Sequence, residues 1–254
     1  MSYLDEVGAD YKRLKRILNE SFGKLQCFVD ENFEEYKLVS YHSGLFKLRE
    51  LISESENLPK EAIKGLDNGI SDFLDFIWLI YVGRYKASIA SLRNGLDIFG
   101  RGLIRMNNSS LETNSFSNNI EKVLKEARLR EEAKLHGVKN KKAHKKYINE
   151  EFTEKIVSMY GTLSDSIHGK DETTANLSHY IESSLDFSGN QDAEIFNEVI
   201  EIAGEVIRSL LSIFIFTNYN YLYSRMNTYK LNLIIDTLGD PFKSYKYKYL
   251  SGVS

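Results

Sequence analysis

The sequence predicts an all-α fold in which helices run up and down beside one another in a bundle. Only two prolines occur among the 254 residues, and proline interrupts helices because it has no N–H to donate and its ring clashes with the preceding turn. Apolar residues recur at steps of three and four along much of the chain, which is the period of one helix face. Apart from a short alternating stretch near the carboxyl end, no pattern suggests strands.

The amino-terminal region is expected to form two helices. Leu, Tyr, Ile and Phe residues at helical spacing predict a long amphipathic helix over about 3–37. The segment 41–44, Tyr-His-Ser-Gly, is typical of a turn, so we expect His42 to be a solvated loop residue. Leucines at 45, 48 and 51 then predict a second helix over about 44–56.

A third helix is expected over about 59–82. Pro59 suits its first turn, where the missing N–H would have no partner in any case. The end of this segment, from Phe73 onward, is apolar nearly all round. That composition predicts a central position in the bundle.

The segment 84–106 has the most regular apolar pattern in the chain, with steps of four and three. That spacing is typical of helices packed nearly antiparallel in a bundle, and we expect it to pack against the long helix 192–226. Gly95 and Gly102 flank the apolar stripe, and each costs about 1 kcal/mol relative to alanine in a helix interior. We therefore expect both glycines to face a closely packed helix, of the same chain or of a second copy.

Polar segments separate the remaining helices and divide the chain. Further helices are expected over about 118–136, 152–169, 192–226 and 230–238, with surface loops over 107–119 and 170–192. The division predicts an N-terminal helical segment, a central bundle, and a C-terminal helix with its tail. These parts span residues 1–58, 59–226 and 227–254.

Composition limits the location and the partners of the chain. Its net charge of −3 argues against a dedicated, strongly basic nucleic-acid protein. The single cysteine, Cys27, cannot form an intramolecular disulfide, which suits a reducing cytoplasm. The start of the chain lacks the basic and apolar regions of a signal peptide. The longest apolar run, 210–216, is too short to span a bilayer. We therefore expect a cytoplasmic protein with no membrane partner.

Several well-known catalytic motifs are absent from the sequence. It contains no HExxH, CxxC, GxxxxGK[ST], GxGxxG or GxSxG pattern. The two histidines at 136 and 144 lie among lysines, which makes a poor metal site. We therefore expect no metal and no cofactor, and neither nucleotide-driven nor serine-hydrolase chemistry.

The helix 152–169 is expected to end on a histidine. His168 falls in its last turn, and Gly169 suits a left-handed C-cap. The negative end of the helix dipole favours a protonated imidazole there. Ser164 and Asp165, four and three residues earlier, lie on the same side and could orient the ring. This arrangement suits acid–base catalysis, and it suits a helix cap equally well.

A run of lysines over 134–147 stands out against the negative net charge. It contains two histidines and no acid, and its six lysines are Lys134, Lys139, Lys141, Lys142, Lys145 and Lys146. Clustered lysines attract a polyanion because binding releases condensed counterions. The run is therefore a candidate nucleic-acid-binding segment, for RNA or DNA. The alternative is a solvated loop.

Two short patterns together resemble the HEPN-like helical proteins of prokaryotic defence systems. The first is Leu92-Arg93-x-x-Leu96, and the second is Tyr160-x-x-Leu163-Ser164-x-x-Ile167-His168-Gly169. The resemblance spans about 60–226. It implies an up-and-down helical bundle that dimerises, here with extra N-terminal and C-terminal helices. Catalytic members of that family are metal-independent RNases with an Arg-x(4–6)-His signature, in which the two residues activate the ribose 2′-hydroxyl and stabilise the phosphorane.

The sequence departs from that signature at its central point. No arginine stands four to six intervening residues before His168, because positions 161–163 are Gly, Thr and Leu. Arg130 and His136 have the right spacing, but Glu131 follows the arginine where the family prefers Asn or Asp. A further option is that Arg93 supplies the missing cation in space.

These patterns leave three functional hypotheses. The first is a non-catalytic HEPN-like subunit of an antiviral or anti-plasmid system, which binds a partner protein or nucleic acid as a homo-oligomer or a complex subunit. The second is a metal-independent ribonuclease that uses His168 with Arg93, with Asp165 and Ser164 in support. The third is an unrelated helical adaptor.

Overall fold

The computed structural model describes residues 3–22, 35–55, 58–81, 84–107, 109–125, 149–167 and 193–238. Every regular element in these ranges is helical, which confirms the all-α fold class. The helices are α1 (Tyr3–Phe22), α2 (Glu35–Ser53), α3 (Lys60–Tyr81), α4 (Tyr85–Asn107), α5 (Phe116–Lys125), α8 (Glu154–Ile167), α10 (Ala193–Arg225) and α11 (Thr228–Asp236). A 3₁₀ turn, η1 (Ser109–Leu111), follows α4, and a π-helical turn, η2 (Asn149–Thr153), leads into α8.

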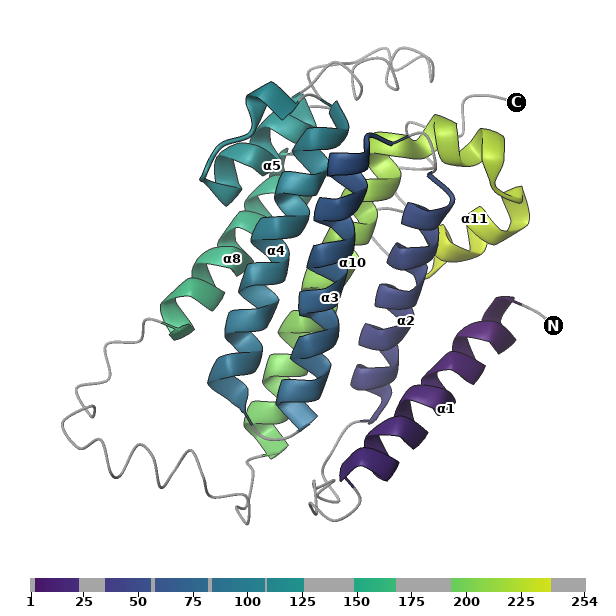
Figure 1. Ribbon diagram of the computed structural model, residues 1–254, viewed down its shortest axis with the longest axis vertical. Helices are drawn as coiled ribbons and strands as arrows, with labels where there is room; N and C mark the ends of the chain where they lie inside the picture. The colour runs from purple at the N-terminus through teal and green to yellow at the C-terminus, as the bar shows by residue number, and fades with distance from the viewer. Residues whose placement is uncertain are drawn as a thin grey trace.

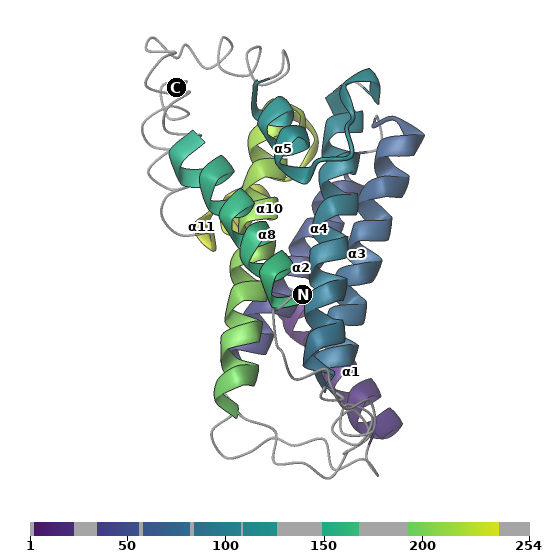
Figure 2. The same ribbon diagram turned by 90° about the vertical axis from the view of Figure 1, so that its left-hand side faces the viewer.

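The long helices alternate in direction along the bundle (Figure 1). Figure 2 shows the α3–α4 pair on one side and α8 with α10 on the other. The centre of α10 is enclosed on all sides, because residues 209–219 are all buried. α5 covers one end of the bundle beside α4 and α8, and α1 lies on the outside against α2. Within the described ranges, no helix combines the length and the apolar composition that a bilayer crossing needs.

The α3–α4 pair is the most extensive helix contact in the described structure. Glycines on both helices let the two backbones approach closely. A Cβ atom added at Gly102 would lie 2.8 Å from the backbone nitrogen of Leu66, and one added at Gly95 would lie 2.5 Å from Cε1 of Phe73. Both glycines therefore face a closely packed helix, as expected, and that helix is α3 of the same chain.

The expected packing of 84–106 against 192–226 is confirmed only in part. α4 contacts α10, but its main partner is α3, and the main partner of α10 is α2. The apolar spacing shows that a helix has a buried face, but it does not say which neighbour covers that face. The glycines decide the partner here, because they allow α3 an approach that side chains would block.

The expected turn at 41–44 is also wrong, because these residues lie inside α2. Of the expected first helix 3–37, residues 3–22 form α1 and residues 35–37 belong to α2, and the part between them lies outside the described residues. Gly44 lets α2 pack closely on α10, since a Cβ atom there would lie 2.9 Å from Cγ2 of Ile207 on α10. His42 is only 5% exposed and pairs with Asp10 of α1 through Nε2 at 3.1 Å. It is therefore a buried partner of α1 and not a loop residue.

Two further expectations need correction. The end of α3 is not enclosed, because Leu74 and Trp78 are 45% and 49% exposed. Only one side of α3 is covered by neighbouring helices, so an apolar composition all round did not place it at the centre.

The expected loop 107–119 contains η1 and the first turn of α5, where Asn119 accepts hydrogen bonds from the backbone N–H and the hydroxyl of Thr113.

Candidate functional site

Three of the four candidate catalytic residues lie in the described part of the chain. Arg93 is on α4, Ser164 and Asp165 are on α8, and His168 lies outside the described residues. The structure brings two of them together, because Nε of Arg93 donates a hydrogen bond to Oγ of Ser164 at 2.8 Å. Asp165 is exposed, and no hydrogen bond or ion pair joins it to Arg93. The candidate site is therefore the contact of Arg93 with α8.

The local sequence explains how Arg93 reaches α8. Leu92 and Leu96 are both 0% exposed and anchor α4 in the core, which leaves Arg93 at the edge of the buried stripe. On α8, Tyr160 and Ser164 are four residues apart and so share one face. The guanidinium carbon of Arg93 lies 4.9 Å from the centre of the Tyr160 ring, over its face.

An aromatic stack supports this contact from below. Tyr160 stacks on Phe116 of α5, with ring centres 4.4 Å apart and planes inclined by 17°. A cation over an aromatic face is worth about 0.5–1 kcal/mol when exposed and more when desolvated. The Ser164 hydroxyl also donates to the backbone oxygen of Tyr160 at 2.9 Å, which fixes its oxygen as an acceptor for Arg93. The guanidinium is thus held both from its Nε edge and from one face.

The electrostatics keep the cluster cationic at neutral pH. Burial raises the pKa of the Tyr160 hydroxyl, and the neighbouring Arg93 charge opposes that shift. Tyr160 therefore stays a neutral phenol. In the described part of the chain, the Nη atoms of Arg93 have no hydrogen-bond partner. Two donors on a pre-positioned guanidinium match the oxygens of a phosphate or a carboxylate.

The other candidate residues cannot be placed. All six lysines of the 134–147 segment lie outside the described residues, as do Arg130 and His136. Among the residues that the structure describes, no three His, Cys, Asp or Glu side chains come together in a way that could hold a metal ion.

The contact of Tyr160 with Arg93 was not predicted, because the sequence analysis used Tyr160 only as the first residue of the short pattern that leads to His168. It also gave no role to Arg101 and Arg105, which lie off the stripe of α4. The structure pairs both with Glu112, from the turn that follows η1. The four-residue spacing of these arginines was a usable sign that they share one face.

Comparisons of the chain with protein-family models, with curated proteins and with solved structures gave no match. Arguments about function therefore depend on the chemistry of the chain's own residues and on the short patterns around Arg93 and Ser164.

Proposed function

We propose that this chain is a non-catalytic, HEPN-like subunit of a prokaryotic antiviral or anti-plasmid system that binds nucleic acid through Arg93. The observation that carries the proposal is the held guanidinium, with Nε on Ser164, one face on Tyr160, and Nη atoms that have no partner among the described residues. The resemblance to HEPN-like proteins supplies the biological setting. It also supplies the expected assembly, with a second copy or as part of a larger complex.

A phosphate group is the ligand that this arrangement suits best. The guanidinium is planar and always charged, and its fork of donors matches two phosphate oxygens. Because Ser164 and Tyr160 already hold it, little side-chain entropy is lost when a phosphate binds. A local cation of this kind is compatible with the net charge of −3 of the whole chain.

Among the described residues, the neighbours of Arg93 favour binding over cleavage. Attack by a ribose 2′-hydroxyl needs a base beside the cation. Ser164 already accepts from Arg93 and donates to a backbone carbonyl. Burial raises the pKa of the Tyr160 hydroxyl, so that group stays protonated. Neither hydroxyl is therefore arranged to act as the base.

The test is binding of labelled single-stranded RNA and DNA to the purified chain, at two salt concentrations. Arg93→Ala should weaken binding about tenfold or more, because a hydrogen-bonded charge pair is worth about 1.5–3 kcal/mol. Arg93→Lys keeps the charge and loses the fork, so it should give an intermediate affinity. Arg16→Ala is the matched control, since Arg16 is an exposed arginine of α1 paired with Glu20. If folded Arg93→Ala binds as tightly as the wild type, the proposal is wrong.

A ribonuclease is the second candidate, and one observation favours it. Ser164 precedes His168 by four residues in the sequence, and Ser164 is the residue that Arg93 contacts. The spatial contact thus brings an arginine to the helix that leads to the candidate histidine. The family's chemistry would then use Arg93 to stabilise the phosphorane charge.

Cleavage of labelled RNA in EDTA separates the two candidates. If the chain is a ribonuclease, His168→Ala and Arg93→Ala should each abolish cleavage while the melting transition is retained. Asp165→Asn is a useful comparison. Asp165 is exposed and would only orient the histidine, so its substitution should lower the rate less than His168→Ala or Arg93→Ala does. A wild type that cleaves, together with a folded His168→Ala that does not, would overturn the non-catalytic proposal.

A further inference from the structure

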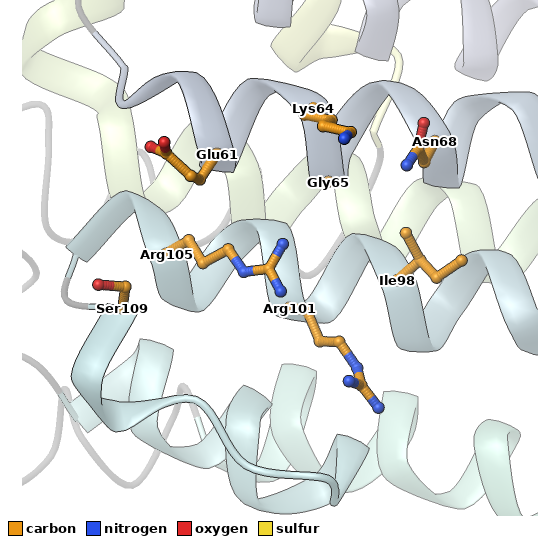
Figure 3. Close-up of a pocket in the computed structure, with 8 residues that line it drawn as sticks. All are labelled: Glu61, Lys64, Gly65, Asn68, Ile98, Arg101, Arg105 and Ser109. Carbon is orange, nitrogen blue, oxygen red and sulfur yellow. The ribbon is translucent and has the colours of Figure 1, made fainter.

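A second cationic site lies between α3 and α4, at the far end of α4 from Arg93. A groove of about 570 Å³ opens there (Figure 3). Its lining residues are Glu61, Lys64, Gly65, Asn68, Ile98, Arg101, Arg105 and Ser109. Arg93 and Arg105 are twelve residues apart on one helix, which places their Cα atoms about 18 Å apart along its axis at 1.5 Å per residue. The groove is therefore a separate site from the contact of Arg93 with Ser164.

Arg105 is held in place from outside the groove. Its Nε and Nη2 donate to the two carboxylate oxygens of Glu112 at 2.6 and 2.7 Å. These hydrogen bonds lower the pKa of Glu112, so the carboxylate stays charged and keeps the guanidinium fixed. The remaining nitrogen, Nη1, has no hydrogen-bond partner among the described residues. It would lie 3.7 Å from a Cβ atom built on Gly65, so it faces the floor of the groove.

Gly65 keeps that floor at backbone level. A Cβ atom there would lie 3.0 Å from Cα of Gly102, so the crossing of the two helices excludes a side chain. Figure 3 shows Arg105 pointing toward α3, whereas Arg101 points away from it. Arg101 is engaged by Asp97 at 3.1 Å. The groove therefore receives one fixed guanidinium donor, whose Nη1 lies near Gly65.

The other lining groups complete a polar set of mixed chemistry. Lys64, Asn68 and Ser109 are exposed, and their side chains make no hydrogen bond with any described residue. Lys64 and Arg105 can take phosphate oxygens, and the amide of Asn68 can pair with the edge of a base. Glu61 can accept from a sugar hydroxyl, and Ile98 offers an apolar surface. The volume lies in the range of small-ligand sites, which is about 300–1,000 Å³.

We propose that this groove binds a free nucleotide, with its phosphate on Lys64 and Arg105. A phosphate alone would use the two cations but not Glu61, which is the only acid that lines the groove. A nucleoside phosphate uses the cations, the acceptor and the apolar wall together. The phosphate of a nucleic-acid strand has the same chemistry, and the experiment below separates the two sources.

The experiment is calorimetric titration of the full chain with AMP, with inorganic phosphate and with adenosine as separate titrants. AMP should bind, and the other two titrants should bind at least about tenfold more weakly. Lys64→Ala should raise the Kd for AMP about tenfold, since one charge-assisted contact is lost. Lys60→Ala is the matched control, because Lys60 is an exposed lysine one turn earlier on α3 that does not line the groove. Arg105→Lys, checked by its melting transition, should weaken AMP binding as well.

Any of three results would overturn the proposal. The first is that AMP does not bind at millimolar concentration. The second is that Lys64→Ala binds AMP as tightly as the wild type does, and the third is that adenosine binds as tightly as AMP. Loss of RNA binding in Lys64→Ala without loss of AMP binding would assign the groove to a strand and not to a free nucleotide. The readout for this groove is the effect of Lys64→Ala on AMP binding, and the readout for Arg93 is the effect of Arg93→Ala on binding of an RNA or DNA strand, so failure of one proposal is distinguishable from failure of the other.

Discussion

The α3–α4 pair and the α1–α2 pair are both antiparallel, but different forces hold them together. α3 and α4 meet along glycines, and atoms of one backbone lie where a side chain of the other would otherwise be. Phe73 and Phe99, both 0% exposed, pack beside this contact with ring centres 6.2 Å apart. Ser91 and Asn94 of α4 also donate hydrogen bonds to Asp72 of α3. Most of the attraction is dispersion and the burial of apolar surface, which has little dependence on pH or salt.

α1 is attached by fewer buried apolar side chains, together with contacts of titratable groups. Among the described side chains of α1, only Val7 is buried, whereas Leu4 and Ile17 are 56% and 45% exposed. Asp10 pairs with the buried His42, and the ring of Tyr11 meets the imidazole edge-on at 5.5 Å. Such contacts depend on the protonation state of a few groups.

The other end of α1 is held in a similar way. Nζ of Lys230, from α11, lies 5.3 Å from the centre of the Tyr3 ring and pairs with Glu50 of α2. Burial, with the Glu50 charge beside it, raises the pKa of the Tyr3 hydroxyl. The α3–α4 pair should therefore open only when the whole bundle unfolds. α1 should open locally and at lower cost.

The largest effect is expected on the buried face of α4. Leu96 is 0% exposed, so Leu96→Asp buries an unpaired charge and should destabilise the fold by about 4 kcal/mol or more. Chemical denaturation followed by circular dichroism would measure the loss. An unshifted transition would mean that the buried face of α4 does not carry the stability of the bundle.

A smaller loss is expected from Gly102→Ala. The added Cβ would lie 2.8 Å from the backbone nitrogen of Leu66, so the helices must separate, at a cost of about 1–3 kcal/mol. Gly8→Ala is the matched control, because nothing lies within 4 Å of a Cβ atom at Gly8 of α1. There the higher helix propensity of alanine should add up to about 1 kcal/mol. Thermal melts should shift in opposite directions, and equal shifts would contradict the comparison.

The attachment of α1 should weaken in acid. Burial lowers the pKa of His42 below its ordinary value of 6.5, and Asp10 opposes this shift only in part. The imidazole Nδ1 is buried without a hydrogen-bond partner, so a proton added there finds no acceptor. A detached α1 would leave His42 with its ordinary pKa and a greater affinity for protons. The attached state is therefore fully stable above about pH 6.5 and loses stability as the pH falls below that value.

Amide hydrogen exchange measures this effect by region. After correction for the intrinsic pH dependence of exchange, protection of 3–22 should fall between pH 7.5 and 5.5, while that of α3 and α4 should not. His42→Phe keeps a ring and cannot titrate, so it should remove the pH dependence. Protection of α1 that rises in acid would show that the Asp10 charge outweighs burial.

The smallest effect is expected at the surface. Nζ of Lys37 pairs with Glu201 of α10 at 2.8 Å, and the Glu201 side chain is 65% exposed. Exposed ion pairs contribute about 0–1 kcal/mol and are screened by salt. Lys37→Met should therefore change the melting temperature by no more than a few degrees, less than Gly102→Ala does. A larger loss would mean that the Lys37–Glu201 ion pair contributes substantially to the packing of α2 on α10. The α2–α10 contact would then resemble the α1–α2 contact in its dependence on charged groups.

Some of the site could be anticipated from the sequence. Arg93, Ser164 and Asp165 were chosen from two short patterns, and the structure places the first two within hydrogen-bond distance. The support from Tyr160 and Phe116 was not predictable, because Phe116 lies on a helix whose position relative to α8 depends on tertiary packing. The groove at Lys64 and Arg105 was missed for the same reason. Its walls are 41 residues apart in numbering, from Lys64 to Arg105, and meet only where α3 crosses α4.

The sequence by itself determined where most helices lie. Pro59 marks the start of α3, and apolar steps of three and four outline α4, α8 and α10 to within a few residues of their observed ends. These signals are local, because helix formation depends on hydrogen bonds and side-chain positions within one or two turns. Only the tertiary structure decided which faces meet. The sequence suggested a turn at Gly44, whereas the structure shows that Gly44 lets α2 pack closely on α10. Gly102 likewise leaves room for Leu66 of α3. A glycine inside a helix can indicate that another element packs closely against it, but only the tertiary structure shows which element that is.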